Sequence, residues 1–184
     1  FFTDVSDASG TSLLDVGARS WSPEMLDALG WSGQWMPEVT ESTEATAKVS
    51  AEASASIGLP EGIPIIAGGG DQAAQAVGCG IVREGLVSAT LGTSGVVFAQ
   101  SDEYRVEPEG KLHAFCHAVP GKWHLMGVML SAAGSFQWYK NQLGSEEQKS
   151  EDAGGPNAYD TLTAGAESVP AGSEGLIFLP YLSG

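Results

Sequence analysis

Residues 63 to 74 read Ile63-Pro64-Ile65-Ile66-Ala67-Gly68-Gly69-Gly70-Asp71-Gln72-Ala73-Ala74. A short apolar run of β-branched residues bounded by glycines is typical of a buried strand. The small residues from Gln72 to Val77 favour a helix instead. Asp71 is therefore predicted to lie where a strand ends and a helix begins, a position at which α/β proteins commonly form sites.

Asp71 is the sharpest candidate for a catalytic group. The three preceding glycines have no side chains, so they leave room for a ligand close to the backbone. The Asp71 carboxylate could then act on that ligand as a general base. A simpler interpretation is that Asp71 caps the helix by accepting N–H groups of Ala73 and Ala74, and capping is far commoner than catalysis. The residues alone leave both interpretations open.

A second candidate is the segment Gly92-Thr93-Ser94-Gly95. It separates the strand-like runs 86–91 and 96–99, which predicts a β-hairpin. Flexible backbone N–H groups and two hydroxyls at a hairpin tip are suited to holding a phosphate, although glycine and hydroxyl residues also dominate ordinary tight turns. It is not a Walker loop, because no Gly-Lys-Ser/Thr sequence follows a strand.

The remaining pattern predicts mixed helices and strands, an α/β chain. A pair of strands joined by Pro120-Gly121-Lys122 is expected at residues 113–119 and 123–128. The expected helices start after a cap at Ser9–Ser12, after Ser22-Pro23 and at Ser131, the last ending near Leu143, and a solvated helix is expected at residues 41–57. The polar segment 145–156 is predicted to be a mobile loop, and Trp21, Trp31 and Trp35 are predicted to pack between short helices.

Cysteine and histidine give little support to a metal site. On a strand, His113 and His117 share a face with Phe115, whereas Cys116 points the opposite way. His124 lies further along, and buried or substrate-edge histidines are the better interpretation. Two isolated cysteines also argue against a disulfide scaffold and fit a reducing cytoplasm.

Composition excludes some partners. With 23 acidic and 8 basic residues, the net charge is −15, so nucleic acid and anionic membranes would be repelled across the whole surface. Phosphates of ATP can still bind, because local N–H groups hold them. No apolar run approaches the roughly 20 residues of a membrane span. Because the sequence starts at Phe1-Phe2 and stops after an apolar run, we expect an internal piece of a longer, cytoplasmic protein.

Several motifs, taken in order, resemble one family. They are Ser6-Asp7-Ala8-Ser9-Gly10-Thr11, the segment 68–74, Ala76–Ile81, Leu91–Phe98, His113–Ala118, Trp123–Met126, Met129–Gly134 and Phe178–Gly184. Together they resemble the FGGY carbohydrate kinases, most closely the subgroup that phosphorylates D-xylulose. The resemblance runs nearly end to end, and it is specific because the motifs recur in the right order.

This resemblance implies a fold of two ribonuclease-H-like, actin-type domains that close over ATP and sugar. The period of the sequence changes near residue 82. Residues 1–82 would then be the end of the N-terminal, sugar-binding domain, and residues 83–184 the start of the C-terminal, nucleotide-binding domain. The actin-type fold would be incomplete.

The resemblance also implies roles in sugar binding and proton transfer. Asp71 matches the family's catalytic aspartate, which takes the proton from the sugar hydroxyl as that oxygen attacks the γ-phosphate of ATP. The implied reaction is phosphorylation of D-xylulose at O5. Gln72 sits where the family places a sugar-contacting amide-type side chain.

Nucleotide contacts follow from the same resemblance. Gly92, Thr93 and Ser94 match a phosphate-contacting loop, and Gln137 resembles a residue near the nucleotide in glycerol kinase relatives. A glycine that those relatives use four residues earlier is Ala133 here, which weakens the match. ATP and Mg²⁺ are the implied cofactors, and a homodimer is a possible assembly of the full-length protein.

What is missing leads to further expectations. The family's N-terminal Asp-x-Gly-Thr phosphate and metal motif and its C-terminal adenosine loop are not in this sequence, so the chain alone is expected to be inactive. Three alternatives stay open: a kinase for another sugar or polyol, a non-catalytic sugar-binding or pseudokinase module, and a metal-binding structural domain. Asp71 and the turn at residues 92–94 cannot choose the sugar, because all kinases of the family would share them.

Overall fold

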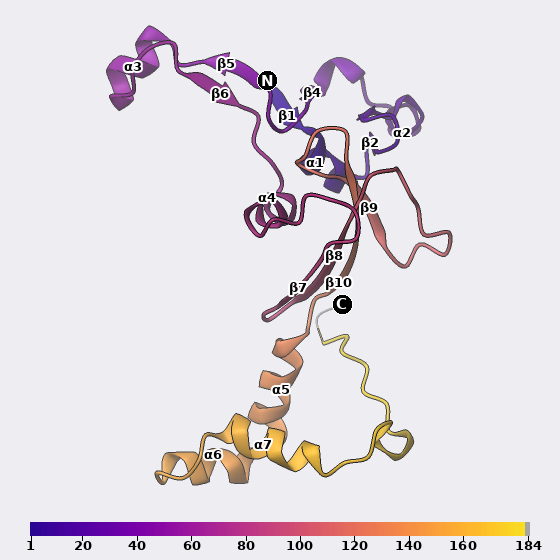
Figure 1. Cartoon of the computed structure of the whole chain (residues 1–184), viewed down its shortest axis with the longest axis vertical. Helices are drawn as coiled ribbons and strands as arrows, with labels where there is room; N and C mark the ends of the chain where they lie inside the picture. Colours follow the sequence, from indigo (N-terminus) through magenta and orange to yellow (C-terminus); the bar gives the residue numbers. More distant parts are fainter. Residues whose placement is uncertain (183–184) are drawn as a thin grey trace. The chain divides into compact units, whose positions relative to one another are not determined.

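The computed structural model describes residues 1–182, so Ser183 and Gly184 of the last motif lie outside it. The chain divides into two compact units, which Figure 1 labels by element. Unit 1 comprises residues 1–88 and 97–127, and unit 2 comprises residues 89–96 and 128–184. Strands of one sheet contribute to both units: β7 (Val87–Leu91), β8 (Gly95–Ser101) and β10 (Trp123–Met129).

Unit 1 alternates short strands with helical turns. Its first elements are β1 (Phe2–Asp4), α1 (Val5–Ala8), the 3-10 turn η1 (Ser9–Thr11), β2 (Leu14–Asp15), β3 (Ser20–Trp21), α2 (Pro23–Leu29), η2 (Gly33–Trp35) and β4 (Glu38–Thr40). The unit continues with β5 (Ala45–Lys48), α3 (Ala51–Ile57), β6 (Pro64–Ile66), α4 (Asp71–Gly78) and β9 (His113–Cys116).

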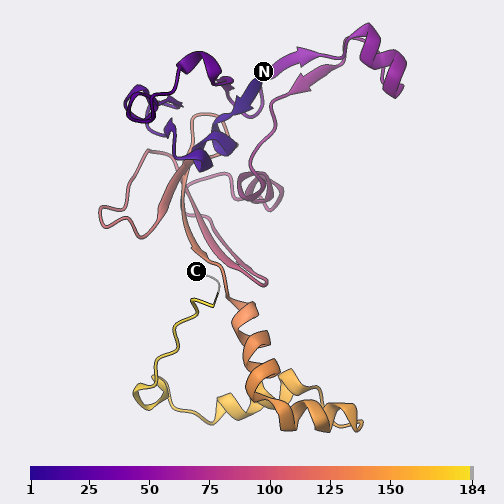
Figure 2. The same ribbon diagram turned by 180° about the vertical axis from the view of Figure 1, so that it is seen from behind.

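Strand pairing joins distant parts of the chain. β1 pairs with β4 in parallel, whereas β2 pairs with β3 and β5 with β6 in antiparallel. Both views show β5 and β6 side by side, with α3 connecting them (Figures 1 and 2). The largest sheet has the order β7-β8-β10-β9. The predicted hairpin and the predicted pairing of segments 113–119 and 123–128 are confirmed.

A small apolar core holds unit 1 together where α1 meets β2 and β9. Its buried members are Val5, Ala8, Leu14 and Cys116, and partly buried apolar side chains pack against them. Arg19 adds a polar tie: Nε and a terminal nitrogen each donate to Glu41 at 2.7 Å, and the other terminal nitrogen donates to the carbonyl of Lys122 at 3.0 Å. The N-terminal segment is thus fixed to the β9–β10 turn.

Helix α2 forms as its sequence predicts. Ser22 is the N-cap and accepts the N–H of Met25, Pro23 occupies the first turn, and Gly30 ends the helix with φ +68°. Leu26 is buried, whereas Leu29 is 49% exposed.

Three predictions for the first part of the chain were wrong. No helix carries Leu14, because Ser12 turns the chain in a left-handed conformation and Leu14 then pairs with Trp21. The segment 41–57 is helical only over α3, since its first half forms β5. The strand around Ile65 exists, but Ile65 is 46% exposed because its sheet has only two strands.

The prediction that the tryptophans pack between helices holds only in part. Trp21 lies against the core of unit 1 and donates its indole N–H to the carbonyl of Pro37 at 2.7 Å. Trp31 and Trp35 are 45% and 70% exposed. The short helices around them leave much of both rings uncovered.

Unit 2 is helical beyond the hairpin tip. Its elements are α5 (Ala133–Leu143), α6 (Ser145–Asp152), α7 (Ala158–Glu167) and η3 (Ser173–Gly175), seen from behind in Figure 2. Helix α5 confirms the predicted helix from Ser131 to about Leu143. Phe136 meets Tyr159 edge to face at 5.1 Å between centroids, and the Lys140 ammonium lies 4.4 Å from the Tyr159 ring centre.

The predicted loop at 145–156 was wrong over α6. Its sequence is polar, but Glu, Gln and Lys are good helix formers. Glu146 and Glu147 lie in the first turn, where their negative charges interact favourably with the positive end of the helix dipole. Lys149 also forms an ion pair with Glu146 at 2.9 Å. Polarity marks this segment as solvated, not as irregular.

Candidate functional site

Asp71 is the first residue of α4, which confirms the predicted junction between strand and helix. Gly70 is the N-cap, and its carbonyl accepts the N–H of Ala74 at 2.9 Å. The Asp71 carboxylate accepts the N–H of Gln72 at 2.7 Å and is otherwise exposed. The cap interpretation therefore lacks the geometry expected of it, because the side chain is not the group that closes this helix end.

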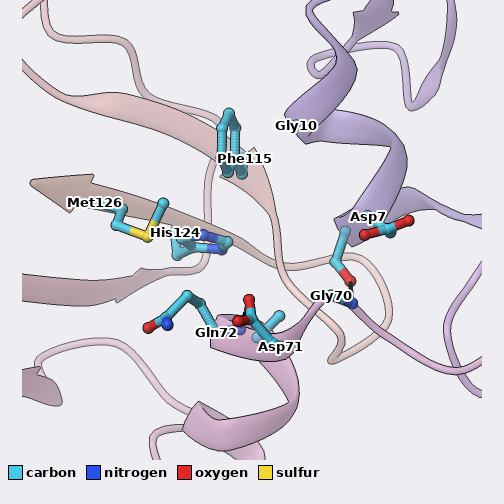
Figure 3. A pocket seen from close by; sticks show the side chains of 10 residues that line it. Asp7, Gly10, Gly70, Asp71, Gln72, Phe115, His124 and Met126 are labelled. Carbon is cyan, nitrogen blue, oxygen red and sulfur yellow. Dashed lines mark hydrogen bonds between the residues drawn. The ribbon is translucent and has the colours of Figure 1, made fainter. Parts of the chain in front are cut away.

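Asp71 faces a pocket of about 130 Å³ within unit 1 (Figure 3). The start of α4 contributes Asp71 and Gln72, and α1 contributes Asp7. Strands β9 and β10 contribute the opposing apolar and aromatic groups, Phe115, His124 and Met126. Two carboxylates, an amide and an imidazole ring thus line the pocket together with apolar side chains, a combination suited to a small polar ligand.

His124 is the most unusual group in this pocket. It is 2% exposed and stacks on Phe98, with ring centroids 4.1 Å apart. Among residues 1–182 neither ring nitrogen finds a hydrogen-bond partner of acceptable geometry. Buried polar atoms without partners cost about 1–3 kcal/mol each, so such a side chain is rarely kept for packing alone.

Burial sets the charge state of His124. Loss of solvation and, to a smaller extent, the neighbouring His117 together lower its pKa to about 3. The nearby Cys116 backbone opposes this shift slightly, by a contact whose geometry falls short of a hydrogen bond. The ring is therefore neutral near pH 7. A neutral imidazole offers one donor and one acceptor nitrogen.

His117, a second buried histidine of unit 1, has hydrogen-bond partners for both ring nitrogens. The N–H of Val119 donates to Nδ1 at 3.0 Å, so the proton lies on Nε2, which is 2.9 Å from the carbonyl of Ile81. Burial lowers the pKa of His117 as well. Both of its nitrogens are used inside the protein, in contrast to those of His124.

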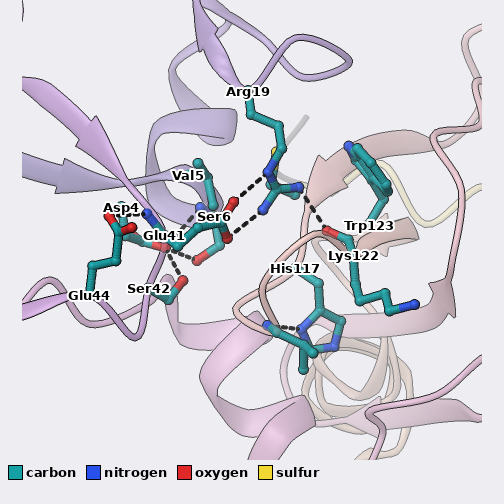
Figure 4. Close-up of polar contacts among 12 residues, drawn as sticks. Asp4, Val5, Ser6, Arg19, Glu41, Ser42, Glu44, His117, Lys122 and Trp123 are labelled. Atoms are coloured by element: carbon teal, nitrogen blue, oxygen red, sulfur yellow. Dashed lines mark hydrogen bonds and ion pairs between the residues drawn. The ribbon is translucent and has the colours of Figure 1, made fainter.

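The loop that carries Asp71 is held by a chain of hydrogen bonds. The N–H of Gly70 donates to Ser6 Oγ at 2.9 Å. Ser6 Oγ in turn donates to the buried Asp4 carboxylate at 2.5 Å (Figure 4). Ser42 Oγ donates to the same carboxylate oxygen at 2.6 Å. Asp4 is 3% exposed. Through Ser6, this arrangement fixes the start of α4 to the N-terminal segment.

Glycine is required in this loop for space and for conformation. Gly68 has φ +89°, and a Cβ on Gly69 would lie 3.2 Å from the Cβ of Ala118. The run of three glycines and the motif that contains Ser6 are both visible in the sequence. It carries no signal for Asp4 or Ser42, because their contact joins residues 38 positions apart.

The turn Gly92-Thr93-Ser94 belongs to unit 2 and is bound to the start of α5. The carbonyl of Thr93 accepts the N–H groups of Ala132 and Gly134 at 2.8 and 3.1 Å, and Gly92 O accepts that of Ala133 at 3.0 Å. These N–H groups would otherwise be unsatisfied at a helix N-terminus. The turn is therefore held by the helix while its own residues stay exposed.

Within the turn, the two hydroxyls differ. Ser94 Oγ donates to the carbonyl of Leu130 at 3.1 Å, so its proton is used inside unit 2. The Thr93 hydroxyl is on an exposed residue. Gln137 is also exposed and lies one turn along α5 from Ala133. Unit 1 thus brings Asp71 and Gln72 together, and unit 2 holds the turn and Gln137.

The described histidines and cysteines do not form a metal site. Across residues 1–182, no group of three or more His, Cys, Asp or Glu side chains is arranged to hold a metal ion. Cys116 instead donates its thiol to the carbonyl of Val16 at 3.5 Å, and burial raises its pKa. No helix within those residues is long and apolar enough to cross a membrane.

Comparisons with known proteins agree along the whole chain. Residues 1–78 match the N-terminal domain of the FGGY family of carbohydrate kinases, and residues 87–184 match its C-terminal domain. The xylulose kinase of Escherichia coli (strain K12) is 42% identical over all of this chain and 36% of its own length.

Solved structures are similar as well. The xylulose kinase of Rhodospirillum rubrum has a TM-score of 0.82 and 28% identity, covering the whole chain and 36% of that protein. The gluconate kinase of Lactobacillus acidophilus has a TM-score of 0.81 and 26% identity, covering the whole chain and 35% of that protein. The chain spans about a third of the length of these relatives, so it holds an incomplete part of their fold, and the expected fold class is confirmed.

Proposed function

Because the chain belongs to the FGGY family of carbohydrate kinases, we propose that the protein containing it transfers the γ-phosphoryl group of ATP to a sugar hydroxyl. The proposed reaction converts D-xylulose to D-xylulose 5-phosphate. Similarity to a xylulose kinase at 42% identity supports this choice of sugar.

One observation carries the proposal: an aspartate at the first position of α4 faces a pocket, supported by a buried hydrogen-bond chain. In the proposed step Asp71 accepts the proton of the sugar hydroxyl. The hydroxyl oxygen forms a bond to the γ-phosphorus as the bond to the β-phosphate oxygen breaks, releasing ADP. Gln72 would orient the sugar, because its amide both donates and accepts hydrogen bonds.

Unit 2 would supply contacts to the nucleotide. The turn offers backbone N–H groups and the Thr93 hydroxyl to phosphate oxygens, and Gln137 would lie near the nucleotide. Mg²⁺, when bound, neutralises phosphate charge. The described residues contain no suitable group of metal ligands, so we assign no step of the reaction to the metal.

The identity of the sugar is the part of the proposal that has a specific rival. A gluconate kinase is structurally as similar to this chain, by TM-score, as a xylulose kinase is. An aspartate base and a phosphate-binding turn suit any sugar hydroxyl. A kinase for another sugar or polyol is therefore the second candidate.

The test uses the complete protein that contains this chain, assayed with ATP against D-xylulose, D-ribulose, gluconate and glycerol. Asp71→Asn should lower kcat about 10²- to 10⁴-fold, the usual contribution of a general base, while ATP binding is retained. Glu52→Gln is the matched control, because Glu52 is an exposed carboxylate in the first turn of another helix of unit 1.

The outcomes separate the candidates. Preference for D-xylulose together with an inactive Asp71→Asn variant supports the full proposal. Preference for another sugar keeps the base and changes the substrate. Equal activity of the parent and Asp71→Asn, or no turnover of any sugar, rejects the proposed mechanism and leaves a sugar-binding module.

A further inference from the structure

His124 supplies a polar group to the pocket that the proposed chemistry does not use. Its side chain is almost fully buried, and its two nitrogens have no partner among residues 1–182. The buried His117 nearby, at 5.9 Å between ring centroids, has both nitrogens hydrogen-bonded inside the protein. The difference between the two rings indicates that the partner of His124 is not among residues 1–182.

The surroundings of His124 show where such a partner would sit. His124 pairs with Phe115 across β10 and β9, and both rings line the pocket. Figure 3 shows the imidazole between Phe115 and the pair Asp71 and Gln72, which come from α4. Stacking on Phe98, at an interplanar angle of 19°, fixes the ring plane. The ring is therefore held in place beside the proposed site of the sugar.

The chemistry of the ring narrows the ligand. A ring whose pKa is about 3 is a poor general base near pH 7, and the described residues offer no set of ligands for a metal. It can donate one hydrogen bond and accept another, which matches a hydroxyl or a carbonyl of an uncharged polyol. Carboxylate oxygens, as on Asp71, accept hydrogen bonds. The two side chains are complementary.

We propose that His124 hydrogen-bonds a hydroxyl or carbonyl of the sugar from the β10 side of the pocket and thereby helps to select which sugar is bound. This rests on the proposed function, because the sugar is its ligand. The role is recognition: His124 neither moves the transferred proton nor contacts the phosphoryl group. A site whose buried polar group needs the ligand's hydroxyl discriminates against sugars that lack it.

The decisive variant is His124→Phe in the complete protein. Phenylalanine keeps a flat ring for stacking on Phe98 and removes both unpaired nitrogens. We expect KM for D-xylulose to rise about tenfold or more, kcat to change much less, and Tm to stay level or increase. His124→Gln, which restores a donor and an acceptor, should recover part of the lost affinity.

His117→Phe is the matched control. It replaces the neighbouring buried imidazole in the same way, but it leaves the carbonyl of Ile81 and the N–H of Val119 without a partner. We expect a lower Tm with KM for the sugar unchanged. His124→Phe should therefore raise KM without lowering Tm, whereas His117→Phe should lower Tm without changing KM. This contrast distinguishes a ligand-binding histidine from a structural one.

The sugar atom can be identified with xylitol, 1-deoxy-D-xylulose and D-ribulose as alternative substrates. The parent enzyme should discriminate against the analogue that lacks the matching group, and His124→Phe should lose that discrimination. Unchanged KM and unchanged discrimination in His124→Phe, with an active parent, overturn the inference and leave the proposed function standing.

Direct binding covers the case in which no kinase activity is found. D-xylulose is titrated by calorimetry into the parent, His124→Phe and His117→Phe. Weaker binding only in His124→Phe supports the inference even without catalysis. Equal binding in all three, or no binding of any sugar to the parent, overturns it. If His124→Phe does not fold, the His124→Gln variant and the analogue series on the parent decide the question.

Discussion

The backbone N–H of Gly70 donates a hydrogen bond to Oγ of Ser6, 64 residues earlier in the chain, at 2.9 Å. The same oxygen donates its own proton to Asp4. A buried carboxylate thus supports, through one hydroxyl, the residue immediately before Asp71. The position of the proposed base depends on the N-terminal strand β1.

Removing that hydroxyl should affect both folding and activity. In Ser6→Ala, Gly70 loses its acceptor and Asp4 loses one donor, so we expect about 1–3 kcal/mol less stability and a lower kcat. Urea unfolding and steady-state kinetics of the complete protein measure the two effects. Ser42→Ala is the control, because Ser42 Oγ donates to Asp4 whereas the N–H of Gly70 is bound by Ser6. It should lose stability and keep kcat; equal kcat in both variants would show that Ser6 does not position Asp71.

The lack of space at Gly69 gives a second prediction. Gly69→Ala places a methyl group 3.2 Å from the Cβ of Ala118, so the loop before Asp71 must shift, at about 1–3 kcal/mol. We expect lower kcat and a lower Tm. Gly78→Ala, at the end of α4 with open space around its Cβ, should be neutral or slightly stabilising. A Gly69→Ala variant with parental Tm and kcat would contradict the crowding between this loop and Ala118.

Stability should depend on pH through His124. Its folded pKa, about 3, is below the unfolded value of about 6.5, so the unfolded chain binds the extra proton and stability falls as pH drops from 6.5 towards 3. Protonation of this group in the unfolded chain lowers the free energy of unfolding by about 2 kcal/mol between pH 7 and pH 5. Urea midpoints at the two pH values should differ less in His124→Phe than in the parent. Asp7 and Asp71, which line the same pocket, are present in both proteins. An identical pH dependence in the two would rule out this role.

The Thr93 hydroxyl should affect the nucleotide and not the sugar. Thr93→Val keeps the branched shape and removes the hydroxyl from the exposed turn, so we expect KM for ATP to rise several-fold, or kcat to fall, with KM for the sugar unchanged. Thr163→Val, on an exposed position of α7, is the control. Parental kinetics with ATP in Thr93→Val would remove this hydroxyl from the proposed phosphate site.

The isolated chain should not be a kinase. Residues 1–184 carry Asp71 and the turn, but the described part offers no group of metal ligands, and positioning of ATP needs more than one loop. Incubating the purified chain with ATP, Mg²⁺ and D-xylulose should give no sugar phosphate. Turnover at a rate near that of the complete protein would disprove this.

The sequence could predict the local parts of this architecture because their signals are local. A cap at Ser22, a left-handed glycine at 30 and the Gly-Thr-Ser turn each specify their own neighbourhood, and the structure confirms all three. The junction at Asp71 followed from a change in residue type over a few positions. The roles of Asp71, Gln72, Gly92, Thr93, Ser94 and Gln137 and the boundary near residue 82 stay predictions.

Pairing between distant segments could not be predicted in the same way. Ala45–Lys48 has little strand propensity, and it forms β5 only because β6 pairs with it. Asp4 supports Gly70 across a long sequence separation, and no local pattern marks it. His124 was recognised as a buried or substrate-edge histidine, but only coordinates show that its nitrogens lack partners within residues 1–182 while those of His117 do not.

The contacts between the turn at residues 92–94 and the start of α5 have a mechanical consequence. Four hydrogen bonds join the turn to residues 130–134, three of them from N–H groups at the helix start to carbonyls of the turn. A movement of α5 within unit 2 should therefore move Thr93 as well. A ligand that displaces Gln137 on α5 would also displace the turn, so the two proposed nucleotide contacts are coupled.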